Sequence, residues 1–193
     1  MLFLQGMKGE HILKIKAVLL YIIQNSNQNR RDVYSIVKTA YYAQQTHFAK
    51  WALPIFKDRI AALKFGPVPS TIYDILKISR GDISVQRFHQ TDCINVASDA
   101  IGFEDESFFA KEYPDMDFLS ASEIECLDSA IRKVGSMGFG EIADDTHGEE
   151  WARVWNDSSL HYMNDLQIAK EGGADDAIVC YLKEALTIDE VLG

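Results

Sequence analysis

The 193-residue sequence lacks the marks of several protein classes. Its three cysteines, Cys93, Cys126 and Cys180, are odd in number and far apart, which favours buried thiols in a reducing compartment. No apolar run approaches the ~20 residues that cross a bilayer, and no secretory signal pattern is visible. We therefore expect a cytoplasmic protein without a membrane partner.

Catalytic motifs are also missing. The sequence holds no Gly-x-Ser-x-Gly, His-Glu-x-x-His, phosphate-binding loop or Gly-x-Gly-x-x-Gly pattern. The glycines at 135, 138 and 140 follow an expected helix instead of opening one, which argues against phosphate binding. His161 and Asp165, spaced i and i+4, are interpreted as a solvated pair if that stretch is helical. We predict no enzyme, no cofactor and no metal.

The net charge of −10 is unevenly distributed. Residues 1–100 carry 13 Lys or Arg and 7 Asp or Glu, whereas residues 101–193 carry 6 and 22. Such asymmetry fits either an acidic face that meets a basic partner or acidic helices that only increase solubility. The overall acidity argues against nonspecific nucleic-acid binding, because that requires neutralised phosphates.

Apolar spacing predicts a compact α+β domain that is mainly α-helical, with a small antiparallel β-hairpin or three-stranded sheet. Asp32 is expected to cap one helix, and Ser120–Glu123 to open another as a capping box. Helices are expected at residues 11–24, from Asp32 to about 51–54, and at 69–79, 120–134 and 141–145. A second capping-box pattern at Thr146–Glu149 is expected to lead into a helix over 151–155, and a last helix is expected at about 175–186.

Alternating residues predict a hairpin with strands at 83–88 and 94–97, and an extended run at 59–64 that adds a third strand. Residues 99–119 are interpreted as a connection. A single domain is expected over 11–193. Residues 1–10 are interpreted as a disordered start that includes part of an expression tag.

The segment Ile60–Lys77 is the most informative part of the sequence. Gly66 can adopt backbone angles that a side chain forbids, and Pro67 biases it away from the α region. Pro69 suits the first turn of a helix, where its missing N–H costs nothing. The segment predicts an extended run, a forced turn and then a helix.

Four segments in order resemble the Panacea domain of SocA-like and GepA-like antitoxins. The strongest parts of the resemblance are Gly66-Pro67-Val68 and the pattern Thr146-His147 followed by Trp151. The chain departs from the family where Leu63 and Phe65 replace a usual tryptophan. The four segments are Lys38–Gln45, Ala62–Val68 with Tyr73, Asp145–Trp151 and Ile168–Asp176.

The resemblance implies an antitoxin that neutralises a cognate protein toxin by direct binding, encoded beside it and often on a phage or mobile element. Alternatives are an adaptor that delivers the toxin to a protease, a metal-dependent enzyme that uses His147, and a DNA-binding regulator. The implied partner-binding or signature residues are Lys38, Tyr41, Tyr42, Lys64, Phe65, Gly66, Pro67, Val68, Tyr73, Thr146, His147 and Trp151.

The residues of these segments allow more than one interpretation. Lys38 and Lys64 are expected to be half-buried with their ammonium groups at the rim, Lys64 holding a carboxylate of the toxin or of this chain. Thr146–Glu149 is interpreted as a capped helix start in preference to a metal site at His147. Four aromatic residues either pack in the core or line a groove for a partner: Tyr41, Tyr42, Trp51 and Phe56.

Overall fold

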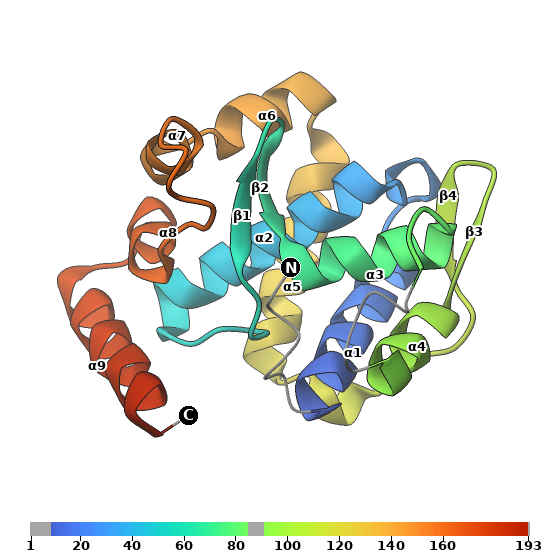
Figure 1. The fold of residues 1–193 in the computed structure, drawn as a ribbon, viewed down its shortest axis with the longest axis horizontal. Coiled ribbons are helices and arrows are strands. Elements are labelled where there is room, and N and C mark those ends of the chain that lie inside the picture. The colour runs from blue at the N-terminus through green and yellow to red at the C-terminus, as the bar shows by residue number, and fades with distance from the viewer. Residues whose placement is uncertain (1–8, 85–90, 193) are drawn as a thin grey trace.

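The computed structural model describes residues 9–84 and 91–192. Within these ranges the chain is mainly helical and carries two separate antiparallel hairpins (Figure 1). This confirms the predicted α+β, mainly helical class. The elements are α1 (Gly9–Asn25), η1 (Gln28–Arg30), α2 (Val33–Trp51), β1 (Ile60–Leu63), β2 (Gly66–Pro69), α3 (Ser70–Arg80), α4 (Thr91–Asp99), β3 (Ile101–Glu104), β4 (Ser107–Ala110), η3 (Met116–Phe118), α5 (Ala121–Ser136), α6 (Phe139–Thr146), α7 (Glu149–Trp155), α8 (Asp165–Glu171) and α9 (Asp176–Leu192).

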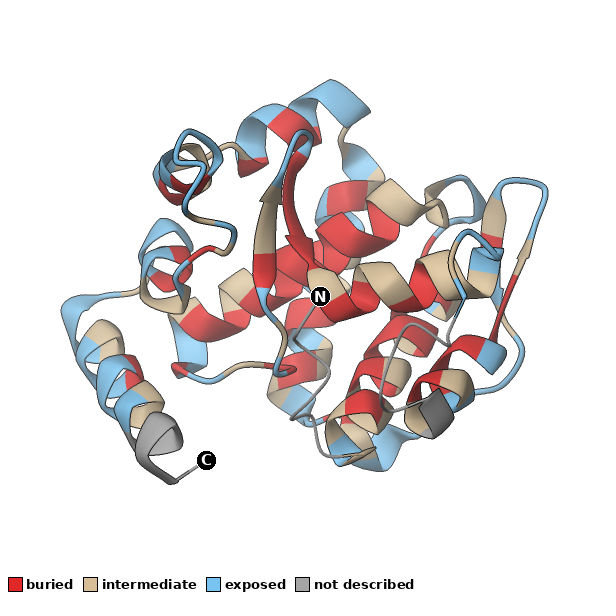
Figure 2. Cartoon of the chain, in the orientation of Figure 1, coloured by how far each residue is buried: buried red, intermediate tan, exposed pale blue. Residues whose placement is uncertain are grey.

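The hydrophobic core is built around α1 and α2 (Figure 2). α1 is buried over most of its surface because it lies against α2, α4, α5 and β4. α5 packs along α2, and α8 contacts the same helix nearer its C-terminal end. In the part of the chain that the structure describes, no helix is long and apolar enough to cross a bilayer.

The predicted helix ends are confirmed where the capping chemistry is strong. The Asp32 carboxylate accepts a hydrogen bond from the Ser35 backbone N–H at 2.9 Å. The Ser120 backbone N–H donates to Glu123 at 2.7 Å, while the Ser120 hydroxyl accepts from the Glu123 N–H at 3.4 Å. Gly81 ends α3 with φ +86°, a conformation that favours glycine.

The expected turn at Gly66–Pro67 is part of the hairpin β1–β2. Leu63 pairs with Gly66, which has φ +99°, and Lys64 and Phe65 form the tip between them. The strand predicted at 59–64 is therefore confirmed, but its partner is β2 and not the predicted hairpin. The other edge of β1 is covered, since the Met163 N–H donates to the Ile60 carbonyl at 2.9 Å.

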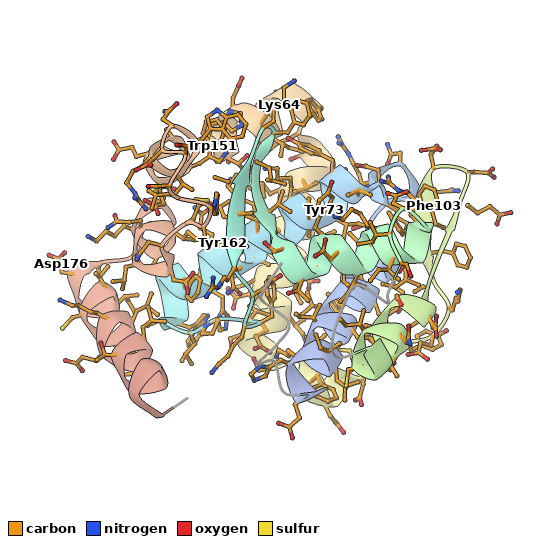
Figure 3. All side chains as sticks on the ribbon, in the orientation of Figure 1. Lys64, Tyr73, Phe103, Trp151, Tyr162 and Asp176 are labelled. Atoms are coloured by element: carbon orange, nitrogen blue, oxygen red, sulfur yellow. The ribbon has the colours of Figure 1, made fainter. Side chains whose placement is uncertain are left out.

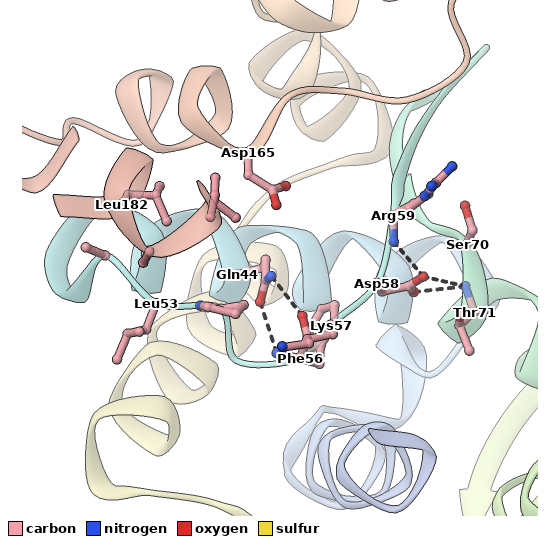
Figure 4. Close-up of a pocket in the computed structure, with 14 residues that line it drawn as sticks. Gln44, Leu53, Phe56, Lys57, Asp58, Arg59, Ser70, Thr71, Asp165 and Leu182 are labelled. Atoms are coloured by element: carbon pink, nitrogen blue, oxygen red, sulfur yellow. Dashed lines mark hydrogen bonds between the residues drawn. The ribbon is translucent and has the colours of Figure 1, made fainter. Parts of the chain in front are cut away.

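Two polar side chains, the buried Gln44 and the half-buried Asp58, fix the base of this hairpin. The Gln44 amide accepts from the Ile55 N–H at 2.8 Å. It also donates to the Phe56 carbonyl at 3.0 Å (Figure 4). The Asp58 carboxylate accepts from the Thr71 N–H at 2.9 Å, which supplies the cap that Pro69 cannot give to α3. The loop leading into β1 is thus tied to both α2 and α3.

The predicted strand at 94–97 is wrong, because this stretch belongs to α4. Ile94, Ala97 and Ser98 are buried at i, i+3 and i+4, which is a helical face, whereas Val96 is exposed. Residues 83 and 84 are not in a strand, and residues 85–90 lie outside the described ranges. The alternation of Ile94 and Val96 was too short to distinguish a strand from a helix.

The interpretation of residues 99–119 as a connection is also wrong, because they contain the hairpin β3–β4. Asp105 and Glu106 form its turn with φ +49° and +59°. Two consecutive positive φ angles are typical of a type I′ turn, for which Asn-Gly is the usual sequence. The Asp-Glu pair does not carry that signal. Phe109 lies across Gly102, so close that a Cβ there would lie 2.1 Å from its ring.

Candidate functional site

Lys38 lies at the centre of the site and is completely buried, with 0% exposure. Its ammonium group donates to the Pro67 carbonyl at 3.2 Å and to the Thr146 hydroxyl at 3.1 Å. Burial lowers the pKa of Lys38 to about 7. The expectation that Lys38 and Lys64 are half-buried is wrong for both residues. Lys38 is fully buried, whereas Lys64 is exposed at the hairpin tip, with its ammonium 5.2 Å from the centre of the Phe65 ring.

Thr146 closes α6 and does not cap the next helix, which corrects the prediction. Its hydroxyl donates to the Ile142 carbonyl at 2.8 Å, so the same oxygen is free to accept from Lys38. Gly148 is the N-cap of α7. His161 likewise does not share a helix with Asp165, since α8 begins at Asp165.

Gly66 sits directly against this buried pair. A Cβ at Gly66 would lie 2.3 Å from the Lys38 Nζ and 2.6 Å from the Thr146 Oγ1. The glycine is therefore required for two reasons, its positive φ and its close approach to both side chains. Three separate elements, α2, β2 and α6, meet at this point.

A stack of three rings supports the other side of the hairpin. The His147 and Trp151 rings lie 3.7 Å apart and nearly parallel, and Trp155 stacks on Trp151 at 5.7 Å. The Trp151 indole N–H donates to the Leu63 carbonyl at 2.9 Å. Burial and the neighbouring Lys38 lower the pKa of His147. Its Nε2 has no hydrogen-bond partner among the residues that the structure describes.

Four exposed hydrophobic side chains gather around the tip of the β1–β2 hairpin, and we call them the hairpin-tip surface. Phe65 meets Phe139 edge to face at 5.4 Å. On the other side, the Leu63 backbone carbonyl accepts from the Trp151 indole N–H, and Trp155 stacks on Trp151. Lys64 and Trp151 mark this end of the molecule in Figure 3. The members and their exposed fractions are Leu63 39%, Phe65 50%, Phe139 52% and Trp155 47%.

The helices beside this surface are acidic. Exposed carboxylates on α6 and α7 include Glu141, Asp144 and Glu149. Asp145 is engaged within the chain, where it accepts from the Tyr42 hydroxyl at 2.6 Å and from Lys133 at 2.7 Å. Its pKa is lowered although burial opposes this, because both donors favour the charged form.

The structure brings together only part of the predicted residue set. Lys38, Gly66, Pro67, Thr146, His147 and Trp151 meet at the hairpin, and Lys64 and Phe65 form its tip. Tyr41, Tyr42, Val68 and Phe56 are buried in the core, while Trp51 is exposed. Tyr73 lies on α3 away from the tip, with the Lys77 ammonium 4.5 Å from its ring centre (Figure 3).

Sequence reasoning missed Phe139 and Trp155. Both are large aromatic residues at polar helix ends, Phe139 between two glycines and Trp155 before Asn156 and Asp157. An aromatic side chain with polar or small neighbours along the chain has few core contacts to make. This pattern is the feature of the sequence that could have predicted exposed aromatic residues. Among the residues described, no group of three His, Cys, Asp or Glu side chains is arranged to hold a metal ion.

Fold and site together define a small, mainly helical protein with a group of exposed hydrophobic side chains around the tip of its β1–β2 hairpin. The chain belongs to the SocA-like antitoxins, since the family model described as "Antitoxin SocA-like, Panacea domain" matches residues 36–152. Membership suggests an antitoxin role, and hence a toxin partner and a protein that is not an enzyme. The comparison with curated proteins found no match, and the comparison with solved structures found none either.

Proposed function

We propose that this protein is an antitoxin that neutralises a cognate toxin in the cytoplasm by direct binding, and that the hairpin-tip surface makes the contact. The observation that carries the proposal is the group of exposed side chains Leu63, Phe65, Phe139 and Trp155 around the hairpin tip, of which Phe65 and Phe139 are in contact. Large aromatic residues dominate the binding energy of protein interfaces. Monomeric proteins rarely expose such groups side by side without a use for them.

The surface is rigidly supported, which favours binding because little conformational entropy is lost on association. Lys38 holds the hairpin to α2 and α6, and Trp151 holds it to α7. The acidic residues Glu141, Asp144 and Glu149 beside it favour a toxin whose contact surface is apolar with a basic rim.

The proposal is tested with the protein encoded by the adjacent gene. We expect that protein to arrest growth when expressed alone and to be harmless when this chain is co-expressed. Phe65→Ala and Phe139→Ala should each weaken the purified complex by about 10- to 100-fold, the range for a central aromatic contact. Binding is measured by isothermal titration calorimetry and neutralisation by growth.

The matched control is Tyr113→Ala, which removes an aromatic side chain that is 87% exposed and lies outside the hairpin-tip surface. It should leave both affinity and neutralisation unchanged. If all three variants bind with wild-type affinity, the toxin contacts another face. The half-life of the toxin in cells separates masking from delivery to a protease, since masking leaves it unchanged.

A further inference from the structure

A second feature of the molecule is a pocket of about 600 Å³ on another face, between the α2–β1 loop, α3, α8 and α9 (Figure 4). Its volume lies in the range of sites that hold small ligands or single side chains. α8 and α9, which form one wall of the pocket, lie outside the residues 36–152 that match the family model. The apolar part of its lining is Ala52, Leu53, Pro54, Phe56, Leu182, Ala185 and Leu186.

Two carboxylates, Asp58 and Asp165, line the pocket, and they differ in the hydrogen bonds that they accept. Asp58 is engaged by the backbone N–H groups at the start of α3, with distances of 2.9 Å to Thr71 and 3.2 Å to Ile72. Asp165 has no hydrogen bond or ion pair among the described residues. It is also not needed as a cap, because Asn164 accepts from the Leu166 N–H at 3.0 Å at the start of α8.

The Asp165 carboxylate points into the pocket (Figure 4). Burial raises its pKa to about 6, and no cation among the residues that the structure describes counters this effect. Arg59 and Lys57 also line the pocket, but the Arg59 guanidinium lies 5.2 Å from the centre of the Tyr162 ring and is directed away from Asp165. A half-buried carboxylate with no hydrogen-bond partner in the described part of the chain therefore faces a largely apolar wall.

We propose that this pocket binds an amphipathic cation, an ammonium or guanidinium group on an apolar chain, with the charged group at Asp165 and the chain against Leu53, Phe56 and Leu182. A cation would supply the charge-assisted hydrogen bonds that the carboxylate lacks. The apolar wall would cover a chain of several carbons. An anion of the same shape could not make these bonds to the Asp165 carboxylate. The inference does not depend on the toxin-binding role of the hairpin-tip surface.

Two probes distinguish the possible sources of such a group. Hexylammonium represents a free amine, and the peptide acetyl-Leu-Arg-Leu-amide represents a basic side chain on a partner polypeptide. Each is titrated into the ¹⁵N-labelled full chain at pH 7.5, where Asp165 is ionised, and the backbone amides of Leu53, Phe56 and Leu182 are followed by NMR. Hexanol and hexanoate serve as neutral and anionic controls.

We expect at least one cationic probe to shift these amides and to bind at least about tenfold more tightly than hexanol, with hexanoate weakest. Asp165→Asn should remove this preference for the cation. Asp176→Asn makes the same change at the first residue of α9, where the side chain is exposed, and should have no effect. The NMR spectrum itself reports whether each variant is folded.

The outcome that overturns the inference is a folded Asp165→Asn variant that binds the cations as the wild type does. Equal binding of hexylammonium and hexanoate, or no shift with either cationic probe, overturns it as well. Binding of the peptide alone would identify the occupant as a side chain of a polypeptide. Binding of hexylammonium alone would identify it as a free amine.

Discussion

Gly66→Ala should destabilise the protein by about 3 kcal/mol, the combined cost of a strained positive φ and of overpacking. The new Cβ would lie 2.3 Å from the Lys38 Nζ and 2.6 Å from the Thr146 Oγ1. The lysine would have to leave its two hydrogen-bond acceptors inside the core. For a chain of this length the loss corresponds to a fall in melting temperature of roughly 6–12 °C. Urea unfolding followed by circular dichroism measures the free energy.

Two other glycines separate the causes. Gly81 has φ +86° but nothing within 4 Å of its Cβ position, so Gly81→Ala should cost only the backbone strain, about 1 kcal/mol. Gly140 lies in α6 with an ordinary φ and open space, and Gly140→Ala should be neutral or slightly stabilising. Equal losses for Gly66→Ala and Gly81→Ala would show that the contact with Lys38 contributes nothing.

The second large effect is a pH dependence of stability caused by Lys38. Its pKa is about 7 in the folded protein, whereas the pKa of a lysine in an unfolded chain is about 10.4. Between these values the unfolded state holds a proton that the folded state has released. Folding is therefore favoured progressively as the pH rises from 7 towards 10, by up to about 1.4 kcal/mol per pH unit.

Lys38→Met removes this titration while keeping most of the buried volume. The stability of the wild type relative to Lys38→Met should rise across pH 7–10 and stay level below pH 7. The measurement is the free energy of unfolding of both proteins at several pH values. Lys64→Met makes the same change at the exposed hairpin tip and is the matched surface control for the buried position. A flat difference for Lys38→Met would mean that the buried lysine keeps its charge at no cost.

The sequence predicted the elements whose signal is local. Asp32 and the Ser120–Glu123 box mark helix starts by side-chain chemistry that needs no tertiary contact, and both are confirmed. Gly66–Pro67 restricts its own backbone, so the turn was predicted from the residues alone. The family resemblance rested on this segment and three others. The match over residues 36–152 confirms the family and covers all of these segments except Ile168–Asp176.

The errors occurred where distant contacts outweigh a weak local preference. The stretch around Ile94 forms a helix because α1 and α3 provide an apolar surface for one helical face. Asp105 and Glu106 adopt positive φ angles although neither residue prefers them, because the flanking strands of β3 and β4 pair. Thr146 resembled a cap but is held by Ile142 and Lys38.

The sequence by itself determined a mainly helical domain, the bend at Gly66–Pro67 and the membership of an antitoxin family. Only the tertiary structure decided that Lys38 is buried against Gly66 and Thr146, that Phe139 and Trp155 join Phe65 on one surface, and that Asp165 faces a pocket. The physical reason is that a turn or a cap depends on neighbours along the chain. The burial of a side chain, its pKa and its place on a surface depend on residues about 30 to 110 positions away along the chain. Only the packing of the folded protein brings such residues together.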